Sequence, residues 1–210
     1  MGEPKKADEL AFASYWDKRY ETGDHLDDQP THEWFRGFDS LKPWLSKHLF
    51  DARPAERDPV IIHLGCGDST IPHDLHVLGY SRQICVDFSA VVIQQMRERY
   101  ADDSGIEWKC ADVRALPEPA GSVDVAFDKG TLDAMIFGSP WDPPETVMRI
   151  LKDDGIFLYV TYRQPHFVRP LLNRHDQWDV VVETLSDGDG SFEYYAFVLR
   201  KKLPQDAGLP

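Results

Sequence analysis

Short apolar runs alternate with amphipathic segments between residues 60 and 162. The apolar runs predict buried strands at residues 60–64, 83–87, 107–110, 123–127 and 156–162. The amphipathic segments predict helices at residues 69–78, 89–100 and 145–151. Strands that alternate with helices are typical of an α/β protein, in which a mostly parallel sheet is covered on both faces.

The two ends of the chain depart from this alternation. Two β-rich runs, 178–185 and 194–200, are separated by SDGDGSF, which is typical of a hairpin, so the sheet should end in an antiparallel pair. The N-terminal part is rich in aromatic residues and predicts helices near 12–20 and 41–49. We expect three parts: an N-terminal extension or lid at 1–58, one main domain at 59–202 and a flexible tail at 203–210.

The charge of the chain narrows the possible partners. The sequence has 36 acidic and 23 basic side chains, a formal net charge of −13. The scattered basic residues disfavour nucleic acid, and the acidic excess favours a basic partner, although it also serves solubility alone. No apolar run is long enough to cross a bilayer, and the N-terminus lacks the apolar centre of a signal peptide. We expect a cytoplasmic protein that binds no membrane.

The cysteines and histidines do not favour a metal site. An odd number of cysteines without a C-x-x-C pair argues against both a disulfide framework and a zinc site. We expect buried, reduced thiols at Cys66, Cys85 and Cys110. His73 and His76 lie three residues apart, but no third ligand follows at a useful spacing.

Candidate chemistry gathers where the first predicted strands end. Gly65 and Gly67 flank Cys66 between a strand and a helix, a position where backbone can approach a ligand. A third glycine, expected at position 70 of a dinucleotide-binding fingerprint, is replaced by Thr70, so a simple tight turn is the alternative. Asp87 ends the second strand and can accept hydrogen bonds from ribose hydroxyls, as NAD and adenosyl ligands both require.

Two further features point to the same crevice. Asp112 ends the third strand, where an acceptor can bind an adenine amino group while Val113 covers the ring. Since the carboxyl ends of parallel strands meet at one edge of a sheet, these residues should converge with Asp87. Trp16 and Tyr20 lie four residues apart on one face of a helix and suit a sulfonium or ammonium, although aromatic residues at this spacing also pack a core.

These motifs resemble a known family. HLGCGDS, CVDFSAVVI, CADVRALP and VDVAFDKGTLDAM are similar to the successive motifs of class I S-adenosylmethionine-dependent methyltransferases. YWDKRY, EWF and DKGTLDAM more narrowly resemble the eukaryotic lysine methyltransferases of translation elongation factor 1-alpha, the methyltransferase-like-thirteen type. The resemblance covers residues 15–162 and 165–167.

The resemblance implies a Rossmann-like fold, S-adenosylmethionine as cofactor, and a lysine of elongation factor 1-alpha as methyl acceptor. It implies cofactor contacts from the glycine turn, from the strand ends, and from N-terminal aromatic residues that close over the cofactor: Gly65, Gly67, Asp87, Phe88, Asp112, Val113, Lys129, Trp16, Tyr20 and Trp34. Asp128, or another acid at the rim, is our candidate for orienting the amine or taking its proton.

Two other functions stay open. One is a methyltransferase for a small molecule or RNA, and the other is a cofactor-binding module without catalysis. In the resembled family this connection contributes to the substrate side of the site, and residues 137–154 make it shorter here than the resemblance implies. We also expect residues between Tyr20 and Trp34 to order only when cofactor binds, because this acidic segment has little apolar surface to bury.

Overall fold

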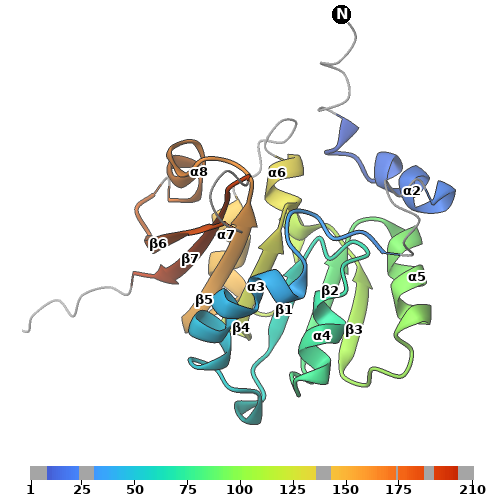
Figure 1. Cartoon of the computed structure of the whole chain (residues 1–210), viewed down its shortest axis with the longest axis horizontal. Coiled ribbons are helices and arrows are strands. Elements are labelled where there is room, and N and C mark those ends of the chain that lie inside the picture. The colour runs from blue at the N-terminus through green and yellow to red at the C-terminus, as the bar shows by residue number, and fades with distance from the viewer. Residues whose placement is uncertain (1–8, 24–30, 136–142, 174, 187–191, 203–210) are drawn as a thin grey trace, which may run out of the picture.

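A seven-stranded sheet forms the centre of the molecule, with strand order β3-β2-β1-β4-β5-β7-β6 (Figure 1). The computed structural model describes residues 9–23, 31–135, 143–173, 175–186 and 192–202. The strands are β1 (Ile61–Leu64), β2 (Gln83–Asp87), β3 (Ile106–Cys110), β4 (Val123–Lys129), β5 (Leu151–Thr161), β6 (Trp178–Leu185) and β7 (Tyr194–Lys201). Neighbours among β1 to β5 pair in parallel, while β7 pairs antiparallel with β5 and β6. The Rossmann-like α/β fold and its antiparallel end are therefore confirmed.

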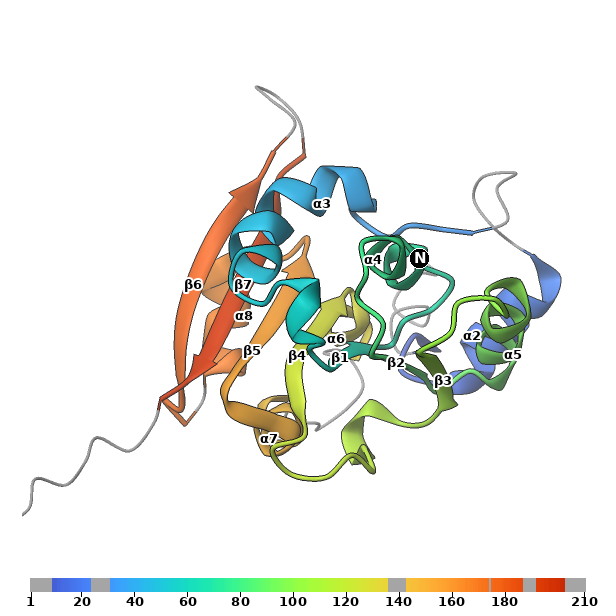
Figure 2. The same cartoon turned by 90° about the horizontal axis from the view of Figure 1, so that it is seen from below.

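Helices cover both faces of the sheet. They are α2 (Ala13–Thr22), α3 (Phe38–Leu45), α4 (Ile71–Val77), α5 (Ala90–Arg99), α6 (Thr131–Met135), α7 (Pro143–Ile150) and α8 (Pro165–Leu172). Figure 2 shows α3 and α4 on one side of the sheet and α7 on the other. Short helical turns span Ser46–Phe50, Ala55–Arg57 and Val113–Ala115.

The core has a layer on each face because successive strand residues point to opposite sides. Ile62, Leu64 and Phe157 pack against buried side chains of α6, α7 and α8. Ile61 and Leu158 face the other way, toward α3 and α4. A third cluster joins α2 and α5 to Cys85 of β2 and Trp108 of β3. This arrangement fixes the positions of the strand ends, where the candidate site lies.

The N-terminal extension contributes to this core. Leu41 and Leu45 of α3 are fully buried in the cluster that lies over β1, β4 and β5. The division between an extension at 1–58 and a domain at 59–202 stays a prediction. The expected tail at 203–210 and residues 137–142 of the short connection lie outside the described residues.

Several expected elements differ in detail. β5 begins at Leu151 rather than at residue 156, with a register shift between Val123 and Val125 on the paired strand β4. The expected helix at 145–151 is α7, which ends at Ile150. Neither α6 nor α8 was expected. Pro170 lies inside α8 and argues against a helix there, and α6, with five residues, is too short to show a helical period.

The prediction of three buried thiols is wrong for Cys110. Cys66 and Cys85 are buried, whereas Cys110 is exposed. Cys110 ends β3, which is the edge strand of the sheet, so one side of the strand has no neighbour to cover it.

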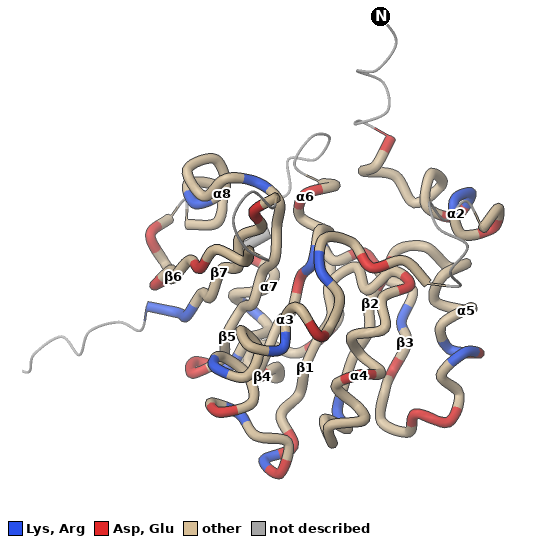
Figure 3. The backbone as a smooth tube through the Cα atoms, viewed as in Figure 1, with Lys and Arg blue, Asp and Glu red and all other residues tan. Residues whose placement is uncertain are grey.

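Charged positions are spread over the described chain. Figure 3 shows Lys and Arg scattered among Asp and Glu positions on several helices and loops. Among the residues that the structure describes, no helix has the length and apolar character needed to cross a membrane. The same residues contain no group of three or more His, Cys, Asp or Glu side chains that could hold a metal ion.

Candidate active site

A glycine turn begins the site. β1 ends at Leu64, and Gly65 and Gly67 then adopt positive φ angles of 61° and 52°. A Cβ atom added to Gly65 would lie 2.1 Å from Oγ1 of Thr131, whose hydroxyl donates a hydrogen bond to the Leu64 carbonyl at 2.7 Å. Glycine is thus required here both for its conformation and for the close approach of α6.

Asp87 links this turn to the end of β2. Its carboxylate accepts a backbone hydrogen bond from Gly67 at 3.0 Å and another from Ser89 at 2.9 Å. Ser89 is also the N-cap of α5, as the sequence predicts. Burial raises the pKa of Asp87 to about 6, although both backbone hydrogen bonds lower it. Each carboxylate oxygen has a second lone pair available, so the group can accept further hydrogen bonds.

The wall beyond Asp87 is made by the chain after β2 and β3. Phe88 and Val113 line the same cavity, and Val113 is buried. Asp112 also lines it and accepts a hydrogen bond from Nε of Arg114 at 2.9 Å. This contact with Arg114 lowers the pKa of Asp112, which keeps the carboxylate ionised as an acceptor.

Three aromatic residues of the N-terminal extension close one side of the cavity. The ring centroid of Trp16 lies 6.1 Å from that of Tyr20 in a stacked arrangement, and 6.1 Å from that of Trp34 in an edge-on arrangement. Tyr20 is buried against α5, so this residue both packs the core and lines the cavity. A Cβ atom on Gly67 would lie 2.9 Å from the Tyr20 hydroxyl, which places Tyr20 against the glycine turn.

Residues 31–36 are attached to the strand ends by a polar network. Glu33 accepts a hydrogen bond from the Ser69 hydroxyl at 2.9 Å at the start of α4. Nζ of Lys129, at the end of β4, lies 2.8 Å from Glu33 and donates to the Trp34 carbonyl at 2.9 Å. Lys129 therefore holds the N-terminal segment in place over the cavity that it lines.

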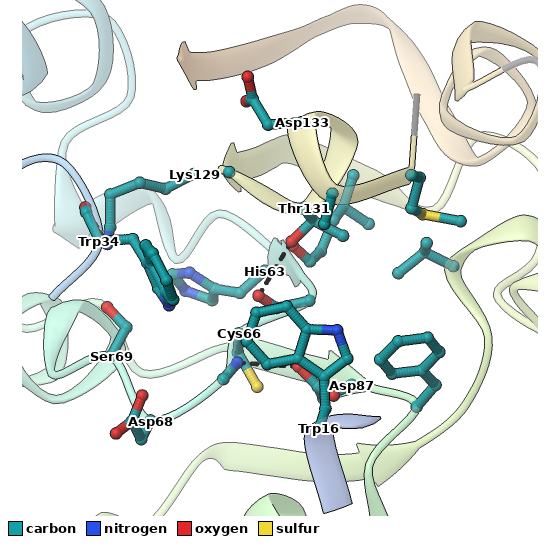
Figure 4. Close-up of a pocket in the computed structure, with 18 of the residues that line it drawn as sticks. Trp16, Trp34, His63, Cys66, Asp68, Ser69, Asp87, Lys129, Thr131 and Asp133 are labelled. Atoms are coloured by element: carbon teal, nitrogen blue, oxygen red, sulfur yellow. Dashed lines mark hydrogen bonds between the residues drawn. The ribbon is translucent and has the colours of Figure 1, made fainter. Parts of the chain in front are cut away.

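These side chains surround one cavity of about 270 Å³. All ten predicted cofactor-binding residues line it: Trp16, Tyr20, Trp34, Gly65, Gly67, Asp87, Phe88, Asp112, Val113 and Lys129. Figure 4 shows Trp16 entering from α2, Asp87 from the end of β2, and Lys129 and Thr131 from the far side. The cavity lies beyond the carboxyl ends of the parallel strands, as expected for such a sheet.

Comparisons with known proteins agree with this geometry. Residues 61–155 match the methyltransferase-domain family. The chain is 34% identical to mouse "EEF1A lysine methyltransferase 4" over 212 residues, which cover 94% of this chain and 78% of the mouse protein. The chain belongs to this family of class I S-adenosylmethionine-dependent methyltransferases. The family resemblance that the sequence motifs indicate is confirmed.

More distant proteins add to the comparison. The zebrafish "eEF1A lysine and N-terminal methyltransferase" is 29% identical to this chain. The match covers 93% of this chain but only 29% of the zebrafish protein. The solved structure of Burkholderia thailandensis 1,6-didemethyltoxoflavin-N1-methyltransferase, with bound S-adenosylhomocysteine, has a TM-score of 0.63 at 16% identity. The match covers 96% of this chain and 91% of the bacterial chain, and it supports the fold alone.

The residues of the methyltransferase cavity fit S-adenosylmethionine, the cofactor of the family. An adenosyl group needs an acceptor for its ribose hydroxyls, apolar walls for its base and close backbone for its amino-acid end. Asp87 offers the acceptor, Phe88 and Val113 offer apolar walls, and Gly65 and Gly67 allow the close approach. The individual contacts stay predictions, because they rest on this fit.

Two buried acids lie near the end of β4, Asp128 within the strand and Asp133 in α6. Asp128 is fully buried, and its carboxylate accepts hydrogen bonds from the backbone of Thr131 at 3.0 Å and of Leu132 at 3.2 Å. Burial raises its pKa well above the ordinary value. The described residues that line the cavity do not include Asp128 but do include Asp133. A catalytic role for Asp128 stays a prediction.

Sequence reasoning assigned no role to several residues that line the methyltransferase cavity. They come from the N-terminal segment, β1, α6 and the end of β5: His32, Phe35, His63, Thr131, Asp133, Met135 and Tyr162. Asp133 accepts hydrogen bonds from the Tyr159 hydroxyl at 2.8 Å and the Thr161 hydroxyl at 2.6 Å, and its carboxylate points away from the cavity centre in Figure 4. The DKGTLDAM motif contains Thr131 and Asp133 and was the available signal.

Proposed function

We propose that this methyltransferase transfers a methyl group to the Nε atom of a lysine in translation elongation factor 1-alpha. The observation that carries the proposal is the 34% identity to EEF1A lysine methyltransferase 4 over most of both chains. The acidic chain, at −13, suits a partner that presents lysine. We further propose that the reaction takes place in the cytoplasm, where a translation factor works.

The chain's own part in the reaction is to bind, orient and exclude water. When bound, S-adenosylmethionine supplies an electrophilic methyl group on its sulfonium. We assign the ribose to Asp87, and the adenine to Phe88, Asp112 and Val113. The methionine end would lie at the glycine turn, near Lys129. Trp16, Tyr20 and Trp34 would shield the sulfonium, since aromatic faces attract such a cation.

The acceptor lysine must lose a proton first, since its ordinary pKa is about 10.4. Asp128 caps α6 with its carboxylate and so can act on the acceptor only through the placement of that helix. Of these two acids, Asp133 is the one that lines the cavity. We therefore propose that Asp128 positions α6 and that Asp133 positions the cavity wall, since its carboxylate is held by Tyr159 and Thr161.

The test is methyl transfer from labelled S-adenosylmethionine to recombinant elongation factor 1-alpha, followed by mass spectrometry of its lysine peptides. We expect label on lysine with the wild-type enzyme and about 100-fold less with Asp87→Ala, because the hydrogen bonds of a charged acceptor are lost. A parallel reaction on lysate, digested with nuclease or protease, covers the alternatives. Label confined to RNA or small molecules would refute the lysine assignment, and binding without any transfer would indicate a non-catalytic module.

A further inference from the structure

Phe35 occupies a strained turn beside the methyltransferase cavity. It has a positive φ of 65°, and the backbone N–H of Arg36 donates to the carbonyl of Trp34 at 2.7 Å, which closes a γ-turn around it. A non-glycine residue in this conformation is strained and persists only where its surroundings fix it. Lys129 fixes it here, because its ammonium donates to the same Trp34 carbonyl.

The strained turn directs the Phe35 ring into the wall of the cavity. A Cβ atom on Gly130 would lie 3.0 Å from this ring, so the ring rests against the backbone just after β4. Its centroid lies 5.5 Å from that of Tyr162 and 5.6 Å from that of Tyr194. Tyr162 lines the cavity and is also 39% exposed, so the Phe35–Tyr162 pair connects the cavity with the surface.

This pair lies at the end of the cavity away from the residues that fit the nucleoside. Asp87 and Asp112 follow β2 and β3, on one side of β1, whereas Gly130 and Tyr162 follow β4 and β5 on the other side. In Figure 1 residues 31–37, which lead into α3, pass along the edge of the sheet where these strands end. The acceptor must approach from this second side if the nucleoside occupies the first.

Cations already lie on the neighbouring rings. The guanidinium carbon of Arg163 lies 5.2 Å from the ring centroid of Tyr162, and that of Arg36 lies 4.8 Å from the ring centroid of Tyr194. Arg163 is in turn held by Asp133, with Nε at 3.1 Å from the carboxylate. Electron-rich ring faces attract cations in this way. The rings of Phe35 and Tyr162 meet edge-on, at an interplanar angle of 62°.

We propose that Phe35 and Tyr162 form the entrance for the acceptor side chain and determine its specificity. The two rings contact the methylene stem of a lysine, and the aromatic faces favour its ammonium before the proton is lost. An unbranched cationic side chain suits such a passage, whereas an anionic one does not. This inference rests on the proposed lysine methyltransferase function and names the residues that select the substrate.

Kinetics with elongation factor 1-alpha as substrate test the entrance. Phe35→Gly removes the ring and suits the positive φ, so the variant should fold, and Tyr162→Ala removes the second ring independently. We expect each to raise KM for the protein about tenfold, the scale of a desolvated cation–π contact, while the Kd of S-adenosylhomocysteine stays within about twofold. Tyr162→Phe, which keeps the ring, should raise KM less than Tyr162→Ala does. Phe167→Ala, which removes an exposed aromatic side chain on α8, should resemble wild type. Unchanged KM in both ring-removing variants would overturn the proposal.

A binding measurement separates this proposal from the proposed function. Nα-acetyl-Nε-trimethyllysine amide and its neutral tert-butyl carbon isostere are titrated into the full chain saturated with S-adenosylhomocysteine and followed by NMR. We expect the cation to bind about fivefold or more tightly than the isostere, and Phe35→Gly to abolish the preference. Such binding without methyl transfer to any protein lysine would refute the proposed function alone. Equal binding of the two probes would refute the aromatic entrance, whatever the enzyme methylates.

Discussion

Asp87 connects the glycine turn, the start of α5 and the cofactor cavity through one buried carboxylate. Its pKa of about 6 reflects burial, partly offset by hydrogen bonds from Gly67 and Ser89. In the proposed complex the ionised carboxylate accepts the ribose hydroxyls, whereas a protonated carboxyl has lost part of that capacity. Cofactor binding and ionisation of Asp87 should therefore favour each other.

Cofactor affinity should consequently depend on pH in a direction that follows from this pKa. Above pH 6 Asp87 is ionised and affinity is highest, and as the pH falls through 6 the group protonates and affinity falls. If only the ionised form binds, S-adenosylhomocysteine should bind about tenfold more weakly at about pH 5 than at about pH 7.5. Calorimetry at several pH values measures this change.

Asp87→Ala is the control for that measurement. This variant should bind S-adenosylhomocysteine more weakly by roughly 2–3 kcal/mol at neutral pH, because hydrogen bonds to a charged group are lost. Its affinity for this ligand should no longer vary between about pH 5 and 7.5. A wild-type affinity that is flat over this range would contradict the role of Asp87. Tighter binding of NAD than of S-adenosylhomocysteine would contradict the cofactor assignment at this residue.

At the residue scale, the sequence predicts those site residues whose place follows from local pattern. Asp87 ends an apolar run and Gly65 follows another, so both could be assigned to strand ends without the fold. Phe35 could not be assigned, because its role depends on a strained turn held by Lys129, which lies far away in the sequence. The local pattern also gave no means of separating Asp128, which faces α6, from Asp133, which borders the cavity.

At the scale of elements, the strands followed from the sequence because the central ones bury apolar runs, whereas β3 and β6 alternate between buried and exposed positions. β2 and β6 have the predicted bounds, whereas β5 begins five residues early at the polar segment Leu151–Gly155. The exposed Asp153 and Asp154 carry no hydrophobic signal, and β5 reaches back past them to Leu151, which pairs with Val123 on β4. The helices α6 and α8 were missed because α6 is too short to show a helical period and Pro170 inside α8 argues against a helix.

Glu33 unites two elements with the N-terminal segment and should therefore matter for stability. It accepts the Ser69 hydroxyl at the start of α4 and pairs with Lys129 at the end of β4. Glu33→Ala leaves the buried Lys129 ammonium without that carboxylate, at a cost of about 2 kcal/mol. For a chain of this size, Tm should fall by roughly 4–8 °C in calorimetry.

The matched control is Glu56→Ala. Glu56 is an exposed glutamate in a short helical turn of the same extension, and its removal should change stability by less than about 0.5 kcal/mol. Glu33→Gln should lie between the two, because an amide oxygen can still accept the Ser69 hydrogen bond. Equal Tm values for the two alanine variants would mean that the Glu33 network contributes nothing to the fold.

At the scale of the whole molecule, the charge of −13 acts on association rather than on the fold. If a basic surface of the protein substrate is recognised, then kcat/KM should fall several-fold as salt rises from about 50 to about 300 mM, because screening weakens long-range attraction. Steady-state assays with elongation factor 1-alpha measure this. S-adenosylhomocysteine affinity over the same salt range is the control and should change little. A salt-independent kcat/KM would show that the net charge serves solubility alone.

Removal of residues 1–35 tests whether the N-terminal extension is a separable lid or part of the fold. The strands from Ile61 onward and the core helix α3 remain, so the truncated chain should still form the sheet. It loses the buried ring of Tyr20 and the Glu33–Lys129 contact, so we expect its Tm to fall by about 5 °C or more. It also loses Trp16 and Trp34 from the cavity, and added S-adenosylhomocysteine should no longer raise its Tm. Hydrogen exchange of the full chain completes the test: a lid gains protection at α2 when the ligand binds, whereas equal protection in both states would identify the extension as permanent packing.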